Sequence, residues 1–272
     1  HTIMRQIVAE TLTLPAQKVH LVMQDTDAIP FESGPGGTRV TYTAGQAALG
    51  AARDLRDKLR AVAAELLEEP VDRIHLSQGQ CVRAGSPPRA LSLEEVVAQA
   101  VTPTGSPMRG EMSVTSTPSG FTSFCAQVAE VEVDPDTGQI TVTKIVTAHD
   151  VGTILNPLTH QGQIEGGMMQ GFGYALMEEL LAEDGHISTL SLGDYKIPTI
   201  NDIPPLVTVL LEPGPGPAPY QSKGIGESSN TPVAAAIANA VVDAVGVRIM
   251  DLPLTAEKVF AALQATSGDS SA

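Results

Sequence analysis

The sequence contains no tryptophan, and aromatic residues make up only 3% of its 272 positions. A core built on stacked aromatic rings is therefore excluded, and the buried side chains must come mainly from valine, isoleucine, leucine, alanine and methionine. The two cysteines, Cys81 and Cys125, are too few for a disulfide framework or a four-ligand zinc site. We expect two buried or partly buried thiols.

Long hydrophobic runs and basic residues are also scarce. No run approaches the roughly 18 consecutive apolar residues of a membrane-spanning helix. Sixteen Lys and Arg stand against 31 Asp and Glu, which gives a formal net charge of −15. Because phosphate backbones are bound by Lys and Arg, this balance excludes a nucleic-acid partner. The hydrophobic fraction of 42% and charged fraction of 17% predict a globular protein. We also expect it to be cytoplasmic and to have no membrane partner.

The opening segment, HTIMRQIVAETL, has its apolar residues at helical spacing and no initiator methionine. It is amphipathic, which does not fit a signal peptide. Because the pattern begins in what looks like mid-helix, we expect that an upstream piece is missing, was cleaved or belongs to another chain.

Helical and strand patterns follow one another irregularly, which favours an α+β fold with mixed or antiparallel sheets over a doubly wound sheet. We expect a first α+β lobe over residues 1–110 and a second over 111–272, because the segment 101–120 is rich in Pro, Gly, Ser and Thr. The helices are expected at about 2–12, 43–69, 92–100, 158–183 and 232–245, with a last one from about 255.

Alternating patterns predict the strands. A hairpin is expected over 74–82 with Gln78-Gly79 as its turn, and a second over 124–133 and 139–148 around the turn DPDTG. Single strands are expected at 19–24 and 206–212.

The segment KGIGE at 223–227 precedes a helix that we expect to begin at Pro232, with Thr231 as its N-cap. Two glycines allow the main chain to approach a ligand closely. A carboxylate before a helix start is favoured by the helix dipole, which keeps it ionised. Glu227 is therefore a candidate general base. On the residues alone, a glutamate that only stabilises the helix start is the favoured interpretation.

Residues 160–171 place several carboxamides on one helix that we expect to be buried by its apolar neighbours. The polar positions are Gln161, Gln163, Glu165 and Gln170. A buried carboxamide must donate and accept hydrogen bonds, which suits the edge of a heterocycle or cross-links within the core equally well. Glycines in this helix indicate that another segment packs against its backbone.

The segment GPGGTRVT at 34–41 combines glycines and hydroxyls just before a helix expected from Thr43. Main-chain N–H groups in such a turn can form an anion-binding nest, although an ordinary surface loop fits as well. It is not a P-loop, since the Lys-Ser/Thr pair is absent. The six histidines show no metal-ligand spacing, so the sequence predicts no metal bound by protein ligands.

Taken in order, these segments resemble the molybdopterin-binding subunits of the xanthine dehydrogenase/aldehyde oxidase family. The resemblance rests on HTIMRQIVAETL (1–12), GGTRVTYTAG (36–45), AHDVGTILNP (148–157), GQIEGGMMQG (162–171), DYKIP (194–198), DIP (202–204), KGIGE (223–227), AIANAVVDAVGVR (236–248) and LPLT (252–255). It spans nearly the whole chain, and the order of the motifs makes it specific.

The resemblance implies a role for Glu227 as the catalytic base. It would take the proton from a Mo–OH group whose oxygen attacks an electron-poor carbon, while a hydride passes to a sulfido ligand. The implied cofactor is molybdopterin, as the cytosine dinucleotide, with Mo. The residues expected to bind it are Gly36, Gly37, Thr38, Thr41, Gln163, Gly224 and Gly226.

The family's full molybdenum-binding subunit is much longer, and its first half has no counterpart here. The chain resembles the medium subunit of split molybdenum hydroxylases such as nicotinate dehydrogenase. This implies a hetero-oligomer with a large molybdopterin subunit, an iron–sulfur subunit and an FAD subunit. The implied reaction hydroxylates an N-heterocyclic aromatic or an aldehyde with water as oxygen donor. Ser228 and Ser229 stand where many relatives have Pro, so the shape of the substrate pocket is expected to differ.

Two other classes of protein fit the sequence. One is a catalytically silent scaffold or assembly subunit of the same fold, which the presence of Glu227, Gln163 and Gly37 disfavours. The other is an independent acidic hydrolase or nucleotide-binding domain, which would fold and act alone.

Overall fold

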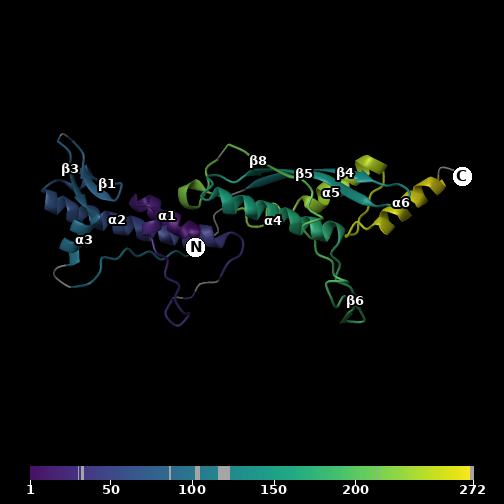
Figure 1. Cartoon of the computed structure of the whole chain (residues 1–272), viewed down its shortest axis with the longest axis horizontal. Helices are drawn as coiled ribbons and strands as arrows, with labels where there is room; N and C mark the ends of the chain where they lie inside the picture. Colours follow the sequence, from purple (N-terminus) through teal and green to yellow (C-terminus); the bar gives the residue numbers. More distant parts are fainter. Residues whose placement is uncertain are drawn as a thin grey trace. The chain divides into compact units, whose positions relative to one another are not determined.

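The computed structural model of this chain describes residues 1–29, 31, 34–85, 87–101, 105–115, 123–212 and 214–269. The chain divides into two units, which are described separately. The first unit is His1–Gly120 with Pro217–Ser222, and the second is Phe121–Gly216 with Lys223–Ala272. Both combine helices with a small sheet, so the predicted α+β class is confirmed (Figure 1). Within the described ranges, no helix is both long and apolar enough to cross a bilayer.

The first unit is organised around the long helix α2 (Gly45–Leu67), on which α1 (Thr2–Leu12) and α3 (Leu93–Val101) pack. A three-stranded antiparallel sheet in the order β1-β2-β3 adjoins α2. Its strands are β1 (Ile74–Ser77), β2 (Gln80–Arg83) and β3 (Arg89–Ser92). Short helical turns lie at η1 (Ala16–Lys18), η2 (Val40–Ala44), η3 (Val71–Arg73) and η4 (Pro219–Gln221). Aliphatic side chains from α1, α2, α3 and the sheet form one core, which confirms that aromatic rings are not needed.

Two local predictions for this unit are confirmed. Gln78 and Gly79 have φ of 49° and 73°, the pair of positive values that a two-residue hairpin turn of type I′ requires. The Ser92 main-chain N–H donates to the Glu95 carboxylate at 2.8 Å, and the Glu95 N–H donates to Ser92 Oγ at 3.2 Å. This reciprocal capping box begins α3. Strand β3, which completes the sheet, was not predicted.

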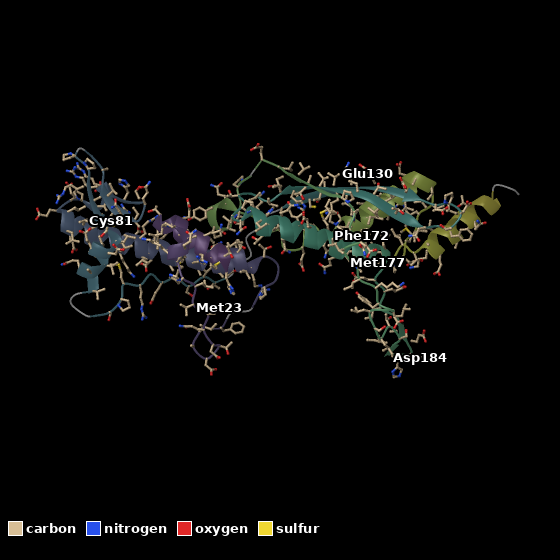
Figure 2. The ribbon with its side chains drawn as sticks, in the orientation of Figure 1. Met23, Cys81, Glu130, Phe172, Met177 and Asp184 are labelled. Carbon is tan, nitrogen blue, oxygen red and sulfur yellow. The ribbon has the colours of Figure 1, made fainter. Side chains whose placement is uncertain are left out.

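The strand expected at 19–24 is absent. Leu21, Val22 and Met23 are exposed, with relative accessibilities of 42%, 76% and 72%. Figure 2 shows Met23 on a loop outside the helices. The alternating pattern was wrong here because a strand needs a partner to satisfy its main-chain groups, and the described part of the first unit pairs none with this segment.

The second unit contains a mixed three-stranded sheet in the order β4-β5-β8. Strands β4 (Phe124–Val133) and β5 (Ile140–Asp150) are antiparallel, as predicted, and β8 (Leu206–Leu210) lies parallel to β5. Helix α5 (Val233–Val245) packs on β4, and α4 (Pro157–Leu176) contacts both α5 and β8. Together with α6 (Ala256–Asp269), these helices bury the inward face of the sheet.

Helix α4 begins where the sequence predicts, because the Asn156 side chain accepts a hydrogen bond from the Thr159 N–H at 3.1 Å. It ends at Leu176, earlier than the predicted residue 183. The N–H groups of Met177 and Glu178 both donate to the Gly173 carbonyl, at 2.8 and 2.9 Å, and this terminates the helix. A small hairpin of β6 (Ala182–Glu183) and β7 (His186–Ile187) follows and projects from the end of α4, with Asp184 near its tip (Figures 1 and 2).

Candidate functional site

Glu227 lies in the second unit on a loop that we call the carboxylate loop, residues 223–230. The loop connects the segment 217–222 to the start of α5. Glu227 sits in a turn, where its carbonyl oxygen accepts hydrogen bonds from the Asn230 N–H at 3.2 Å and from Thr231 Oγ1 at 3.3 Å. Its side chain is exposed, so the carboxylate can be reached by a substrate or cofactor.

The prediction that Thr231 caps α5 is wrong. The helix begins at Val233, its N-cap position is Pro232, and no side chain caps it. Thr231 instead uses its hydroxyl on the Glu227 carbonyl. In the described part of the chain, no group donates a hydrogen bond to the Glu227 carboxylate or forms an ion pair with it. The carboxylate is therefore not occupied by a hydrogen-bond donor or a cation of the described residues.

The start of the carboxylate loop is fixed by Lys223. Its ammonium group forms an ion pair with Asp150 Oδ2 at 2.7 Å, with side-chain accessibilities of 9% and 19%. The Lys223 N–H also donates to the Val151 carbonyl at 2.9 Å. Asp150 is the last residue of β5, so the loop begins tied to the end of the central strand. Sequence reasoning missed this pair, because nothing local relates positions 150 and 223.

Helix α4 holds the loop just before Glu227. Gln163 Nε2 donates to the Gly226 carbonyl at 2.6 Å, so two predicted site residues are brought together. The expectation that the carboxamide face of this helix is buried is wrong: Gln163, Glu165 and Gln170 are exposed. The buried face carries Ile164, Met168, Phe172 and Ala175 instead, because these follow the helical period toward the sheet.

The glycines of α4 divide into two groups. A Cβ at Gly167 would collide with Ser229, and one at Gly171 would lie 2.6 Å from Val233. These two positions therefore let the end of the carboxylate loop and the start of α5 approach the helix backbone, which confirms the predicted close packing. Gly162 and Gly166 are exposed, and a Cβ at either would meet no atom within 4 Å.

Two further side chains hold the loop after Glu227. Gln127 Nε2, from β4, donates to the Ser229 carbonyl at 2.7 Å. The Tyr174 hydroxyl, from α4, donates to the Asn230 carbonyl at 2.8 Å. The Asn230 side chain in turn donates to Gln170 Oε1 at 3.0 Å. Gln127 and Tyr174 were not predicted, and their contacts with the loop depend on the fold.

A buried polar cluster lies on the inward face of the sheet. His149 Nε2 is 2.8 Å from Thr147 Oγ1 and 3.7 Å from Cys125 Sγ. Burial lowers the pKa of His149 below its ordinary value, and repulsion from His160 adds to this; burial also lowers the pKa of His160. Burial raises the pKa of the Cys125 thiol. The cluster is therefore uncharged at neutral pH, because burying the neutral forms of these groups costs less free energy than burying the charged forms.

In the first unit, the predicted residues Gly36, Gly37, Thr38 and Thr41 lie on one turn, residues 36–41, which we call the glycine turn. Gly37 and Thr38 have φ of 50° and 66°. The chain then turns into η2, a π-helical turn that contains Thr41 and continues into α2. The helical path thus begins earlier than the predicted Thr43. Positive φ at a threonine costs free energy and is typical of functional turns.

The donor set fits a flat heterocycle better than a bare metal ion. Beside Gln163, the exposed Gly162 and Gly166 lie one turn apart and leave the α4 main chain accessible to a ring. Gln163 donates through its nitrogen to the loop and keeps its amide oxygen as an acceptor. Over the described ranges, no group of three or more His, Cys, Asp or Glu side chains is arranged to hold a metal ion.

Comparison with known proteins identifies the family. Residues 1–204 match the molybdopterin cofactor-binding domain. The chain is 37% identical over 265 residues to the xanthine dehydrogenase molybdenum-binding subunit of Escherichia coli O157:H7, covering 95% of this chain and 35% of that protein. It is 34% identical over 272 residues to the gamma subunit of the 6-hydroxypseudooxynicotine dehydrogenase complex of Paenarthrobacter nicotinovorans, covering 97% and 34%.

A solved structure agrees with these matches. Quinoline 2-oxidoreductase from Pseudomonas putida 86 superposes with a TM-score of 0.85 and 32% identity, over 97% of this chain and 35% of that chain. The chain thus spans about a third of the length of the relatives it matches. As the ordered motifs predicted, the chain belongs to the molybdopterin cofactor-binding domain family and is related to the molybdenum-binding subunits of the xanthine dehydrogenase/aldehyde oxidase family.

Proposed function

We propose that this chain is the part of a molybdenum hydroxylase that carries the general base, Glu227. The observation that supports this most directly is the exposure of its carboxylate together with the fixed main chain around it. The carboxylate is exposed and free of ion pairs, yet it stands on a loop whose main chain is held on both sides. A surface glutamate that only stabilised a helix would need neither property. A base needs both, since it must be reachable and correctly placed.

The residues proposed to hold the molybdopterin cofactor form two groups. In the second unit these are Gln163, Gly224 and Gly226, and the Gln163 amide oxygen would accept a hydrogen bond from the pterin. In the first unit they are Gly36, Gly37, Thr38 and Thr41, whose N–H groups and hydroxyls suit a phosphate. When bound, the cofactor supplies the two-electron oxidation of the substrate. We propose that the bound form is the cytosine dinucleotide of molybdopterin.

Glu227 performs the proton transfer in this proposal. Its carboxylate accepts a proton from the oxygen nucleophile as that oxygen attacks an electron-poor carbon of the substrate. Gln163 fixes the carbonyl just before Glu227, and we propose that this keeps the carboxylate near the part of α4 that carries Gly162 and Gly166. The exposed helix backbone and the base would then face the same bound ring.

An N-heterocyclic aromatic is the substrate class that we favour, with an aldehyde as the alternative. The names of three relatives refer to xanthine, 6-hydroxypseudooxynicotine and quinoline, each of which contains a nitrogen heteroaromatic ring. Ring carbons next to nitrogen are electron-poor, as hydroxylation by an oxygen nucleophile requires. Ser228, next to the base, would tune the pocket, whereas Ser229 is buried against α4.

The chain is proposed to act only with partners. These are a large molybdopterin subunit that supplies the rest of the cofactor-binding module, an iron–sulfur subunit and an FAD subunit, in a cytoplasmic hetero-oligomer. Several large apolar side chains of the second unit are exposed, among them Phe124, Val128, Leu180, Leu190, Leu192, Ile200, Val207 and Val209. We propose that partner subunits cover some of them.

The test is Glu227→Gln in the purified, molybdenum-loaded complex. We expect turnover to fall by a factor of about 10²–10⁴ while the molybdenum content stays normal, because an amide of the same shape cannot accept the proton. The exposed Glu257, in the first turn of α6, provides the matched control through Glu257→Gln. Turnover above about a hundredth of the wild-type value would refute the assignment of the base. A complex that carries no molybdenum at all would favour the silent scaffold.

A further inference from the structure

We propose that Gln127 and Tyr174 are positioning residues, which place the Glu227 carboxylate by holding the main chain of Ser229 and Asn230. The inference rests on the proposed role of Glu227 as the base. Neither residue touches the substrate or the cofactor in this proposal. Both act through the loop.

The carboxylate loop makes few hydrogen bonds of its own. Its turn is closed by the Asn230 N–H on the Glu227 carbonyl at 3.2 Å, near the long end of the usual range. The carbonyls of Gly226, Ser229 and Asn230 instead accept from side chains, at 2.6, 2.7 and 2.8 Å. The shortest hydrogen bonds to the loop's carbonyls therefore come from side chains of β4 and α4, whereas its own contacts, such as the Val233 N–H on the Asn230 carbonyl at 3.4 Å, are longer.

Gln127 is oriented before it meets the loop. It lies on β4, the strand that pairs with the whole length of β5. Its Nε2 donates to Thr147 Oγ1 at 3.1 Å as well as to the Ser229 carbonyl at 2.7 Å, so both amide hydrogens are used. Turning the amide over would place its oxygen against the Ser229 carbonyl oxygen, which is repulsive. Gln127 thus offers its donor in one orientation.

Tyr174, on α4, makes a second contact with the loop. Its hydroxyl lies 2.8 Å from the Asn230 carbonyl oxygen and 3.2 Å from Asn230 Oδ1. Burial raises the pKa of Tyr174, so the phenol stays protonated and remains a donor throughout the working pH range. A sheet residue and a helix residue therefore hold adjacent carbonyls of the loop.

These three side-chain hydrogen bonds lie on both sides of Glu227 in the sequence. Gln163 holds the residue immediately before it, and Gln127 and Tyr174 hold the residues two and three positions after it. Only Glu227 and Ser228 lie between held carbonyls. Because catalytic groups must be placed within about 0.5 Å of the productive geometry, release of the later hydrogen bonds should let the carboxylate move while the fold stays intact.

The experiment compares Gln127→Met, Tyr174→Phe and the double variant in the purified holo-complex. We expect kcat to fall about tenfold in each single variant and about a hundredfold in the double variant, as for a displacement near 1 Å, with KM and molybdenum content unchanged. Hydrogen exchange of a peptide spanning residues 223–232 should become faster in all three. Matched controls are Gln139→Met and Tyr195→Phe. Their polar groups bond the Ile140 carbonyl at 3.2 Å and the Glu178 carboxylate at 2.6 Å, outside the loop.

Two results would overturn the inference: kcat within twofold of wild type in the double variant, or a fall in kcat without faster exchange in residues 223–232. Tyr174→Phe removes only one oxygen atom. If Gln127→Met does not fold, the positioning role is therefore tested with Tyr174→Phe alone. Glu227→Gln is measured in parallel. If that variant stays active, the assigned base is wrong; if it is inactive while the double variant is normal, only the positioning role is wrong.

Discussion

The glycine turn of the first unit and the carboxylate loop of the second differ in the contacts that shape them. The known contacts of the glycine turn include local ones: Gly37 and Thr38 adopt positive φ, and the Tyr42 N–H donates to the Thr38 carbonyl at 3.0 Å to begin the helical path. The carboxylate loop depends on side chains that lie far away in the sequence. The difference indicates which substitutions each segment tolerates.

A turn that uses positive φ is sensitive to the residues that adopt it, whereas a loop whose carbonyls accept from distant side chains is also sensitive to those side chains. Substitutions within 36–41 should therefore change the conformation of the glycine turn itself. Substitutions in β4, β5 and α4 should act at a distance, on residues 223–230. Two experiments test this difference between the glycine turn and the carboxylate loop, beginning with the larger expected effect. A third tests the buried histidines of the second unit.

The first replaces Gly37 by valine. A β-branched residue at φ of 50° is strained by about 1–3 kcal/mol, and its side chain would stand where we propose that the main chain meets the cofactor. We expect the complex to lose most of its molybdenum, measured by metal analysis. Gly185→Val is the control, because Gly185 also has positive φ, 80°, and no atom lies within 4 Å of its added Cβ. Full molybdenum in Gly37→Val would contradict the placement.

The second removes the anchor of the carboxylate loop through Lys223→Met. This leaves the Asp150 carboxylate, 19% accessible, without its partner, and the expected loss in free energy of unfolding is about 3 kcal/mol. Urea unfolding measures it. Adding Asp150→Asn should recover much of the loss. Lys144→Met breaks an exposed pair with Glu130, at 3.0 Å, and should cost less than about 1 kcal/mol. Equal costs for the two pairs would contradict a special role for Lys223.

The third concerns pH. Since burial lowers the pKa of His149 and His160 in the folded chain, the unfolded chain binds protons first as the pH falls below about 6.5. Stability is therefore full above that pH and declines below it, by up to about 1.4 kcal/mol per pH unit for each histidine, until the folded-state pKa values are reached. Urea unfolding at several pH values should show a shallower decline in His149→Gln and no change in the exposed His186→Gln. An unchanged slope in His149→Gln would contradict burial of a neutral imidazole.

The sequence was informative where structure is local. The β4–β5 hairpin follows from a turn in which Asp134 Oδ1 accepts from the Asp136 N–H at 2.9 Å, and α5 ends as expected at Gly246, with φ of 74°. Each of these signals is complete within a few residues, so it can be found without knowledge of the fold.

It was uninformative where a residue acts through a distant partner. Gln127 is one polar position in an alternating strand, and the atom that it holds lies 102 residues later. Thr231 has the residue type and position of a helix cap, but its hydroxyl is taken by the Glu227 carbonyl. The carboxamides of α4 were expected inside because their neighbours are apolar, but the helical period turns them outward. In each case a tertiary contact overrides the local pattern.

The route of the chain before Lys223 has a mechanical consequence. Residues 217–222 belong to the first unit, where Gln46 donates to the Pro217 carbonyl at 3.1 Å and the Tyr220 and Thr11 hydroxyls lie 2.8 Å apart. The next residue, Lys223, is joined to the end of β5 by its ion pair with Asp150. The carboxylate loop therefore starts from a point that is fixed on the sheet of the second unit.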